Sequence, residues 1–345
     1  MKYLGIKLPT RLASLFEVNF PTLWDTLQAD LLSWKKVKVS WFGRLSIKKM
    51  NVLPRLLYLF QTIPTIIPRN FFAPIKSSIL KFIWHGSRPR VRWTTLTRPK
   101  SAGGVALPDL HKYYFASHLL RLTEWSTGGR RPLWLDLEEV SPEVHLWALP
   151  WIAKSNRPDA LRTHPLITAT LRVWDSTITK RQLSSYPSPL LPLADNPAFP
   201  VGLHPTLGSR ILCPNYPRAS AMLKDATYQP PWEQTPGPNP ATFSEQFNYF
   251  QILHYLRSLP GQHRILRTLS TFERLCVSIT VLKHGVSILY ALLNTTSSND
   301  PPPFESRWAE ILDTPLTEEG WSNTYELIHH GTPMAKMQEQ AYKIL

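Results

Sequence analysis

Cysteine is almost absent from this chain, and with it the patterns of several protein classes. The 345 residues include only two cysteines, Cys213 and Cys276. Two cysteines exclude a disulfide framework and any zinc site built on two or more cysteine pairs. The N-terminal residues also lack an apolar run long enough for a signal peptide. We therefore expect an intracellular protein, nuclear or cytoplasmic, that is not secreted.

A long apolar run free of charge is missing as well. The best candidate for a membrane span, Leu275–Leu293, carries Lys283 and His284 at its centre. A charge at the middle of a bilayer costs about 2.5 to 3.5 kcal/mol on insertion scales. The run is thus predicted to form a core helix or a pair of helices, and no membrane partner is expected.

The patterns of common catalytic centres are missing too. Polymerases and most metal nucleases need at least two carboxylates that converge on Mg²⁺, yet no acidic residue lies between Asp30 and Asp109. No two aspartates are adjacent, and the chain has no GxxxxGK[ST], GxSxG or HExxH motif. His111 and His118 share a predicted helix without a carboxylate or cysteine at ligand spacing, which favours a structural role. We predict no catalytic residue, no metal site and no cofactor.

Positive charge is what the chain has in excess, and it is concentrated in the first part. Residues 1–131 hold 22 Lys and Arg against five Asp and Glu, whereas the remainder has a net charge of −2. No acidic residue occurs from Leu31 to Pro108, where fifteen basic residues lie: Lys35, Lys36, Lys38, Arg44, Lys48, Lys49, Arg55, Arg69, Lys76, Lys81, Arg88, Arg90, Arg92, Arg98 and Lys100. A polyanion that releases counterions on binding is the usual compensation for such self-repulsion. RNA or DNA, bound without sequence preference, is the expected partner, and a solvated basic face without a ligand is the alternative.

Apolar residues at helical spacing predict a mainly α fold. The expected helices span about 19–34, 41–51, 71–84, 110–125, 244–259 and 317–330, and Pro54 is expected to break or kink the second of these. Asn19 is the expected cap of the first helix. Thirteen prolines between Pro187 and Pro240 predict a linker or a long irregular segment.

A basic loop with an aromatic residue at either end is predicted at 85–93. Arg88, Arg90 and Arg92 lie in it, and Trp84 and Trp93 flank these arginines. This composition is typical of a loop that grips a nucleic-acid backbone and offers stacking platforms. Hydrophobic anchoring of the two tryptophans is an equally weighted alternative.

Five segments together resemble a known family. The segments Lys2–Leu8, Ser40–Pro64, Phe71–Val91 and Arg98–Leu119 are similar to the region after the catalytic palm in reverse transcriptases of long interspersed (LINE-type) non-LTR retrotransposons, and Trp308–Leu345 resembles a segment further along the same proteins. The resemblance implies a helical thumb that holds the template–primer duplex by its backbone, followed by a wrist-like region. It also implies other retroelement proteins as possible partners.

The resemblance carries no catalytic residue over to this chain. The family's polymerase signature, an aromatic residue followed by Ala-Asp-Asp, would lie before Tyr3, its endonuclease domain earlier still, and its Cys/His knuckle after Leu345, so no enzymatic activity is expected. The matching segments do imply phosphate contacts from a set of basic residues and a turn that shapes the thumb. The implied phosphate contacts are Arg44, Lys48, Lys49, Arg55, Lys81 and Lys100, to which the charge pattern adds Lys35, Lys36, Arg88, Arg90 and Arg92, and the turn comprises Gly103, Gly104, Leu107, Pro108 and Asp109.

The resulting prediction is a chain of four regions. Residues 1–131 form a basic thumb-like domain, 132–186 a connecting helical region, 187–240 a proline-rich linker, and 241–345 a helical, wrist-like region. The expected function is nucleic-acid binding by a non-catalytic reverse transcriptase fragment. Two alternatives stay open, a host-adopted protein-interaction scaffold and a relic that does not fold stably because the palm is absent.

Overall fold

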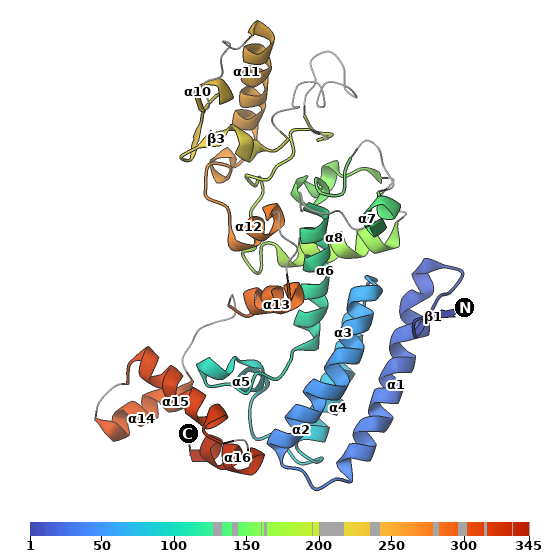
Figure 1. The fold of residues 1–345 in the computed structure, drawn as a ribbon, viewed down its shortest axis with the longest axis vertical. Coiled ribbons are helices and arrows are strands. Elements are labelled where there is room, and N and C mark those ends of the chain that lie inside the picture. Colours follow the sequence, from blue (N-terminus) through green and yellow to red (C-terminus); the bar gives the residue numbers. More distant parts are fainter. Residues whose placement is uncertain are drawn as a thin grey trace. The chain divides into compact units, whose positions relative to one another are not determined.

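The computed structural model of the chain is mainly helical, which confirms the predicted fold class (Figure 1). The structure describes residues 1–126, 133–139, 144–159, 161, 164–194, 196–199, 217–234, 242–278, 283–295, 302–313, 316–332 and 334–344. In these residues the strands form two short antiparallel hairpins, β1–β2 (Lys2–Tyr3, Ile6–Lys7) and β3–β4 (Leu223–Lys224, Thr227–Tyr228). The chain divides into two compact units. One boundary between them lies inside a helix, between Ser117 and His118, and the other lies at the start of a helix, between Gly285 and Val286.

Unit 1 combines Met1–Ser117 with Val286–Leu345. The C-terminal helices therefore belong to the same unit as the basic N-terminal segment, whereas the predicted organisation has a separate wrist-like region at 241–345. Its elements are η1 (Leu12–Ser14), α1 (Leu15–Lys35), α2 (Trp41–Ile47), the π-helical turn η2 (Lys48–Val52), α3 (Leu53–Thr62), α4 (Arg69–Ile83), α5 (Trp93–Thr97), η3 (Lys100–Ala102), the first part of α6 (Leu110–Ser126), α13 (Gly285–Thr295), α14 (Pro303–Leu312), α15 (Glu318–His330) and α16 (Ala335–Ile344).

The first helix of unit 1 is longer than its predicted range. It begins at Leu15, whose side chain is buried, and Pro21 lies inside it. The predicted cap, Asn19, has another role: its amide accepts a hydrogen bond from the N–H of Lys7 at 2.8 Å and donates one to the carbonyl of Lys7 at 2.9 Å. These bonds attach the β1–β2 hairpin to α1. Sequence spacing could not show them because they join residues twelve positions apart.

The predicted break at Pro54 is a change of helix type. The elements α2, η2 and α3 follow one another without an intervening loop. Pro54 is an early residue of α3, directly after the π-helical turn, and because proline has no N–H it cannot donate to the carbonyls of that turn. The π-helical turn before it carries Lys48 and Lys49, two of the residues predicted to contact phosphates.

Unit 2 spans His118–Gly285. Its elements are the second part of α6, α7 (Leu133–Glu138), η4 (Leu149–Trp151), η5 (Lys154–Asn156), α8 (Pro165–Thr177), η7 (Ala219–Met222), α10 (Pro231–Gln234), α11 (Phe243–Ser258), η8 (Gln262–Arg264) and α12 (Thr271–Val277). The centre of the unit is aromatic: Trp174 lies 5.4 Å from Trp151 and 5.2 Å from Phe272, measured between ring centroids.

Part of the predicted proline-rich linker belongs to the core of unit 2. Leu191 and Leu193 are fully buried and pack with residues of α11 such as Tyr249 and Leu256. The described residues of 187–240 hold no helix longer than the four residues of α10, as their proline content predicts. Residues 200–216, Cys213 among them, lie outside the described residues.

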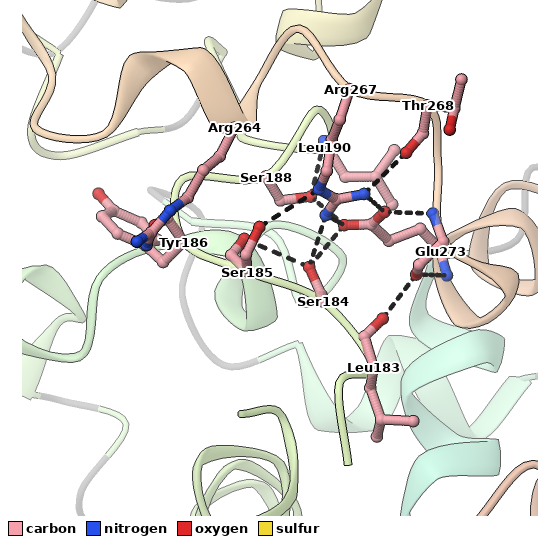
Figure 2. A network of polar contacts seen from close by, with 11 residues as sticks. Leu183, Ser184, Ser185, Tyr186, Ser188, Leu190, Arg264, Arg267, Thr268 and Glu273 are labelled. Carbon is pink, nitrogen blue, oxygen red and sulfur yellow. Dashed lines mark hydrogen bonds and ion pairs between the residues drawn. The ribbon is translucent and has the colours of Figure 1, made fainter. Parts of the chain in front are cut away.

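A buried carboxylate organises the loops around α12 in unit 2 (Figure 2). The side chain of Glu273 has no exposed surface, and Arg267 binds both carboxylate oxygens at 2.6 Å. The hydroxyls of Ser184 and Ser188 donate to Oε1, and the N–H of Ser270 donates to Oε2 at 2.7 Å. Burial by itself would raise the pKa of Glu273, but these donors outweigh it and the pKa is lowered. Because five hydrogen bonds saturate both oxygens, this cluster is a structural clamp.

Replacing Glu273 tests this clamp. The change Glu273→Gln removes the negative charge and leaves the Arg267 guanidinium without its counterion, so we expect a loss of about 3 kcal/mol of stability, measured by urea unfolding. The pKa of Glu273 is lowered on folding, so its contribution is present at neutral pH and is lost as the pH falls through that lowered value.

Glu245 is a matched control, since it forms the same capping box with Thr242 at the fully exposed start of α11. The change Glu245→Gln should shift the urea midpoint far less. Equal shifts for the two variants would contradict the clamp.

Candidate nucleic-acid interface

Seven basic side chains in two segments of unit 1 are exposed to solvent. The segments are the C-terminal end of α1 with the residues after it, and the last turn of α4 with the loop that follows. We call these residues the basic cluster: Lys35, Lys36, Lys38, Lys81, Arg88, Arg90 and Arg92. Six of them are predicted site residues, and Lys38 is the one that the site prediction omitted. The sequence signal for Lys38 is its position just after Lys36, in a run without acidic residues.

The two segments of the basic cluster lie side by side. The Nζ atom of Lys35 is 3.8 Å from the position that a Cβ atom on Gly86 would take. Gly86 has a φ of +87°, and its N–H donates to the carbonyl of Lys81 at 2.8 Å, which turns the chain sharply at the end of α4. The fold thus brings together positive charges that lie about fifty residues apart in the sequence.

No side chain of the basic cluster forms an ion pair within the part of the chain that the structure describes. The acidic residue nearest to it in the sequence, Asp30, pairs with Arg55 at 2.7 Å. Arg55 therefore has a partner and is less available to phosphates than predicted. Lys35 and Lys81 lie in the last turns of α1 and α4, where the helix dipole favours a cation. That interaction does not account for the remaining five charges.

Two of the predicted phosphate contacts are wrong because the side chains are buried. Lys48 has no exposed surface, and its ammonium donates a hydrogen bond to the carbonyl of Pro108. The guanidinium of Arg44 donates to the carbonyl of Phe82 at 2.9 Å and lies 5.8 Å from the centre of its ring. Neither group reaches a phosphate without disrupting the core. The sequence could not separate them from exposed cations because Lys and Arg are rarely buried.

Two further predicted contacts are half-buried. Lys49 donates to the carbonyl of Val105 at 3.1 Å, and Lys100 lies in η3 near it. Burial and then the charge of Lys100 lower the pKa of Lys49 to about 8. Burial also lowers the pKa of Lys48 to about 7, an effect that the carboxylate of Asp109 opposes and the charge of Lys49 reinforces. Lys48 and Lys49 therefore bind internal carbonyls, and each ammonium loses its proton more readily than that of an exposed lysine.

The carbonyls that the two lysines bind belong to the predicted glycine turn. Gly103 has a φ of +74°, and a Cβ atom on Gly104 would lie 2.1 Å from the carbonyl oxygen of Arg98. The positive φ favours glycine at position 103, and at position 104 a side chain would overlap the backbone of Arg98, so two backbone segments approach closely here. Asp109 ends the turn and caps α6, since its Oδ1 accepts from the N–H groups of His111 and Lys112 at 3.0 and 3.2 Å.

The C-terminal helices dock on the same turn. The Nε2 atom of His329 in α15 lies 3.1 Å from the carbonyl oxygen of Gly104, and the hydroxyl of Tyr342 in α16 donates to the carbonyl of Gly103 at 3.3 Å. The predicted structural turn therefore connects both ends of unit 1. Leu107 and Pro108, also predicted in this turn, are buried.

The two tryptophans that flank the basic loop have different environments. Trp84 is buried and stacks on Trp41, with 5.1 Å between the ring centroids and an interplanar angle of 23°. This environment fits the alternative in which the tryptophan is a hydrophobic anchor. Trp93 is half-buried, and the Nζ atom of Lys76 lies 4.7 Å from its ring centre. Of the two, only Trp93 has a ring available to a ligand.

Other kinds of site find little support in the described residues. These residues contain no group of three or more His, Cys, Asp and Glu that could hold a metal ion. None of the described helices is both long and apolar enough for a membrane span. No model of a known protein family matches the chain. The buried thiol of Cys276 has its pKa raised by burial, so it is a poor nucleophile.

The buried ammonium of Lys48 predicts how the stability of the protein depends on pH. Because folding lowers its pKa from 10.5 to about 7, wild-type stability should rise as the pH increases from 7, where the unfolded chain binds the extra proton. The change Lys48→Met removes this group. Between pH 6 and pH 9 the free energy of unfolding of the wild type should rise by about 2 kcal/mol relative to that of the variant, measured by urea unfolding. Lys36→Met, at an exposed position, is the control for removing a lysine charge. A pH-independent difference for Lys48→Met would show that its ammonium is not buried as described.

Proposed function

We propose that this chain binds the phosphate backbone of nucleic acid, without sequence preference, through the basic cluster of unit 1. The single observation that carries the proposal is the cluster itself: seven exposed cations from two adjacent segments, unpaired within the described residues. Folding brings these charges together without an internal counterion, and a polyanion supplies the missing negative charge.

The proposal includes a non-catalytic role within a LINE-type reverse transcriptase. The resemblance of five sequence segments supports that origin, and the helical fold of unit 1 is the one expected for a thumb-like region. In this role the cluster holds a duplex or RNA–DNA hybrid by its phosphates while the chemistry belongs to other parts of such an enzyme.

The first test is binding of the purified full chain to a labelled RNA–DNA hybrid at several salt concentrations, with circular dichroism on the same sample. Six phosphate contacts would give a slope near −5 in log K against log salt, from about −0.9 per contact. A helical protein that does not bind would favour the interaction-scaffold alternative. A protein without helical signal would favour the relic.

The basic loop gives a sharper prediction. Replacing Arg88 and Arg90 together by Gln should reduce the salt slope by about 2 and weaken binding equally across sequences, since both contacts go to phosphates. The matched control replaces Lys154 and Lys180, two exposed lysines of unit 2, and should leave the slope unchanged. The Lys48→Met variant should also keep the wild-type slope. An unchanged slope for the arginine pair would remove the loop from the interface.

A further inference from the structure

A pocket of about 340 Å³ opens on unit 1 beside the basic loop. It lies between α4, Trp93 of α5 and the N-terminal end of α6, all parts of the same unit. Its floor is apolar, because Ile75, Ile79 and Leu110 are buried beneath it. The volume is within the range of small-molecule sites in proteins.

Flat rings form the walls of this pocket. Phe72 and Trp93 are both half-buried, so each keeps part of its ring exposed. The imidazole of His111 extends the wall, with its centroid 4.8 Å from that of Phe72. Aromatic walls over an aliphatic floor favour a planar ring as the ligand, since every nucleobase offers a π-face for stacking.

Cations occupy the rim. Arg69 and Lys76 are exposed side chains of α4, and Lys76 holds its ammonium 4.7 Å from the ring centre of Trp93. The acidic group of the lining, Asp109, already accepts two backbone N–H bonds in capping α6. The pocket thus combines an apolar, aromatic interior with positive charge at its edge. A ligand that matches it joins a flat ring to an anionic group.

We infer that this pocket holds the base of one unpaired nucleotide at the end of a bound strand, with the attached phosphate on Arg69 and Lys76. The inference rests on the proposed function, because the strand is the one whose phosphates lie on the basic cluster. Trp93 directly follows Arg92, the last residue of that cluster. A strand that runs along the loop therefore passes beside the pocket wall that Trp93 forms. The pocket makes the chain a reader of strand ends as well as a binder of duplex.

The test compares two RNA–DNA hybrids of the same sequence, one blunt and one with a single-stranded overhang that ends in 2-aminopurine. We expect the full-length wild-type protein to bind the overhang hybrid about tenfold more tightly, from the stacking of one base. The fluorescence of 2-aminopurine should be quenched on binding, because the base stacks on the pocket walls.

Variants of the pocket separate stacking from charge. Trp93→Ala should lose both the overhang advantage and the quenching, and Trp93→Phe should restore most of both, because phenylalanine keeps a ring at this position. Lys76→Gln, at an exposed position that should not affect folding, should reduce the overhang advantage. The control Lys154→Gln should behave as wild type. Circular dichroism of each variant shows whether unit 1 remains folded.

The possible failures are distinguishable. Equal wild-type affinity for blunt and overhang hybrids, without quenching, would overturn the pocket and leave the proposed function intact. Failure to bind either hybrid would overturn both. Quenching of the free nucleotide, 2-aminopurine riboside 5′-monophosphate, at the same concentration as the overhang would make the pocket a mononucleotide site and overturn the strand-end assignment.

Discussion

Unit 1 depends on one stretch of backbone that accepts hydrogen bonds from four side chains. Its carbonyls, between residues 103 and 108, receive Tyr342, His329, Lys49 and Lys48. The donors come from the π-helical turn η2 and from α15 and α16, which lie more than 200 residues further along the chain. Buried carbonyls need donors, and here the donors also bring the two ends of the unit together. Gly103 and Gly104 make this possible, because residue 103 adopts a positive φ and a Cβ atom at residue 104 would overlap the carbonyl of Arg98.

Two buried ionisable groups, Glu273 and Lys48, have different kinds of hydrogen-bond partner. Glu273 in unit 2 keeps its charge, since an arginine and three other donors surround it (Figure 2). Lys48 in unit 1 has a backbone carbonyl as its hydrogen-bond partner, and its pKa falls to about 7. A carbonyl stabilises an ammonium less than a carboxylate does, so much of the desolvation cost remains. The positive charges of unit 1 are therefore not equivalent, and only the exposed ones can attract a polyanion.

Much of the helical structure could be predicted, because apolar spacing reports which face of a helix is buried. The predicted helices at 71–84 and 110–125 match α4 and α6 within two residues. The start of α1 was placed too late, since the side chain of Asn19 bonds to the β1–β2 hairpin and does not cap the helix. The environments of Trp84 and Trp93 also differ although their sequence contexts are alike. This difference arises because Trp84 stacks on Trp41 and Trp93 lies against Lys76, two contacts that the sequence does not indicate.

By itself the sequence determined the helical class, the excess of positive charge and the glycine turn, because each depends on local composition or on steric limits at single residues. Only the tertiary structure decided which cations remain in water. It buries Lys48 and Arg44, pairs Arg55 with Asp30, and places Lys35 beside Gly86. Burial and pairing depend on contacts between distant segments, and the energy of a charge is set by its solvent exposure and its neighbours. A count of charges along the chain contains neither quantity.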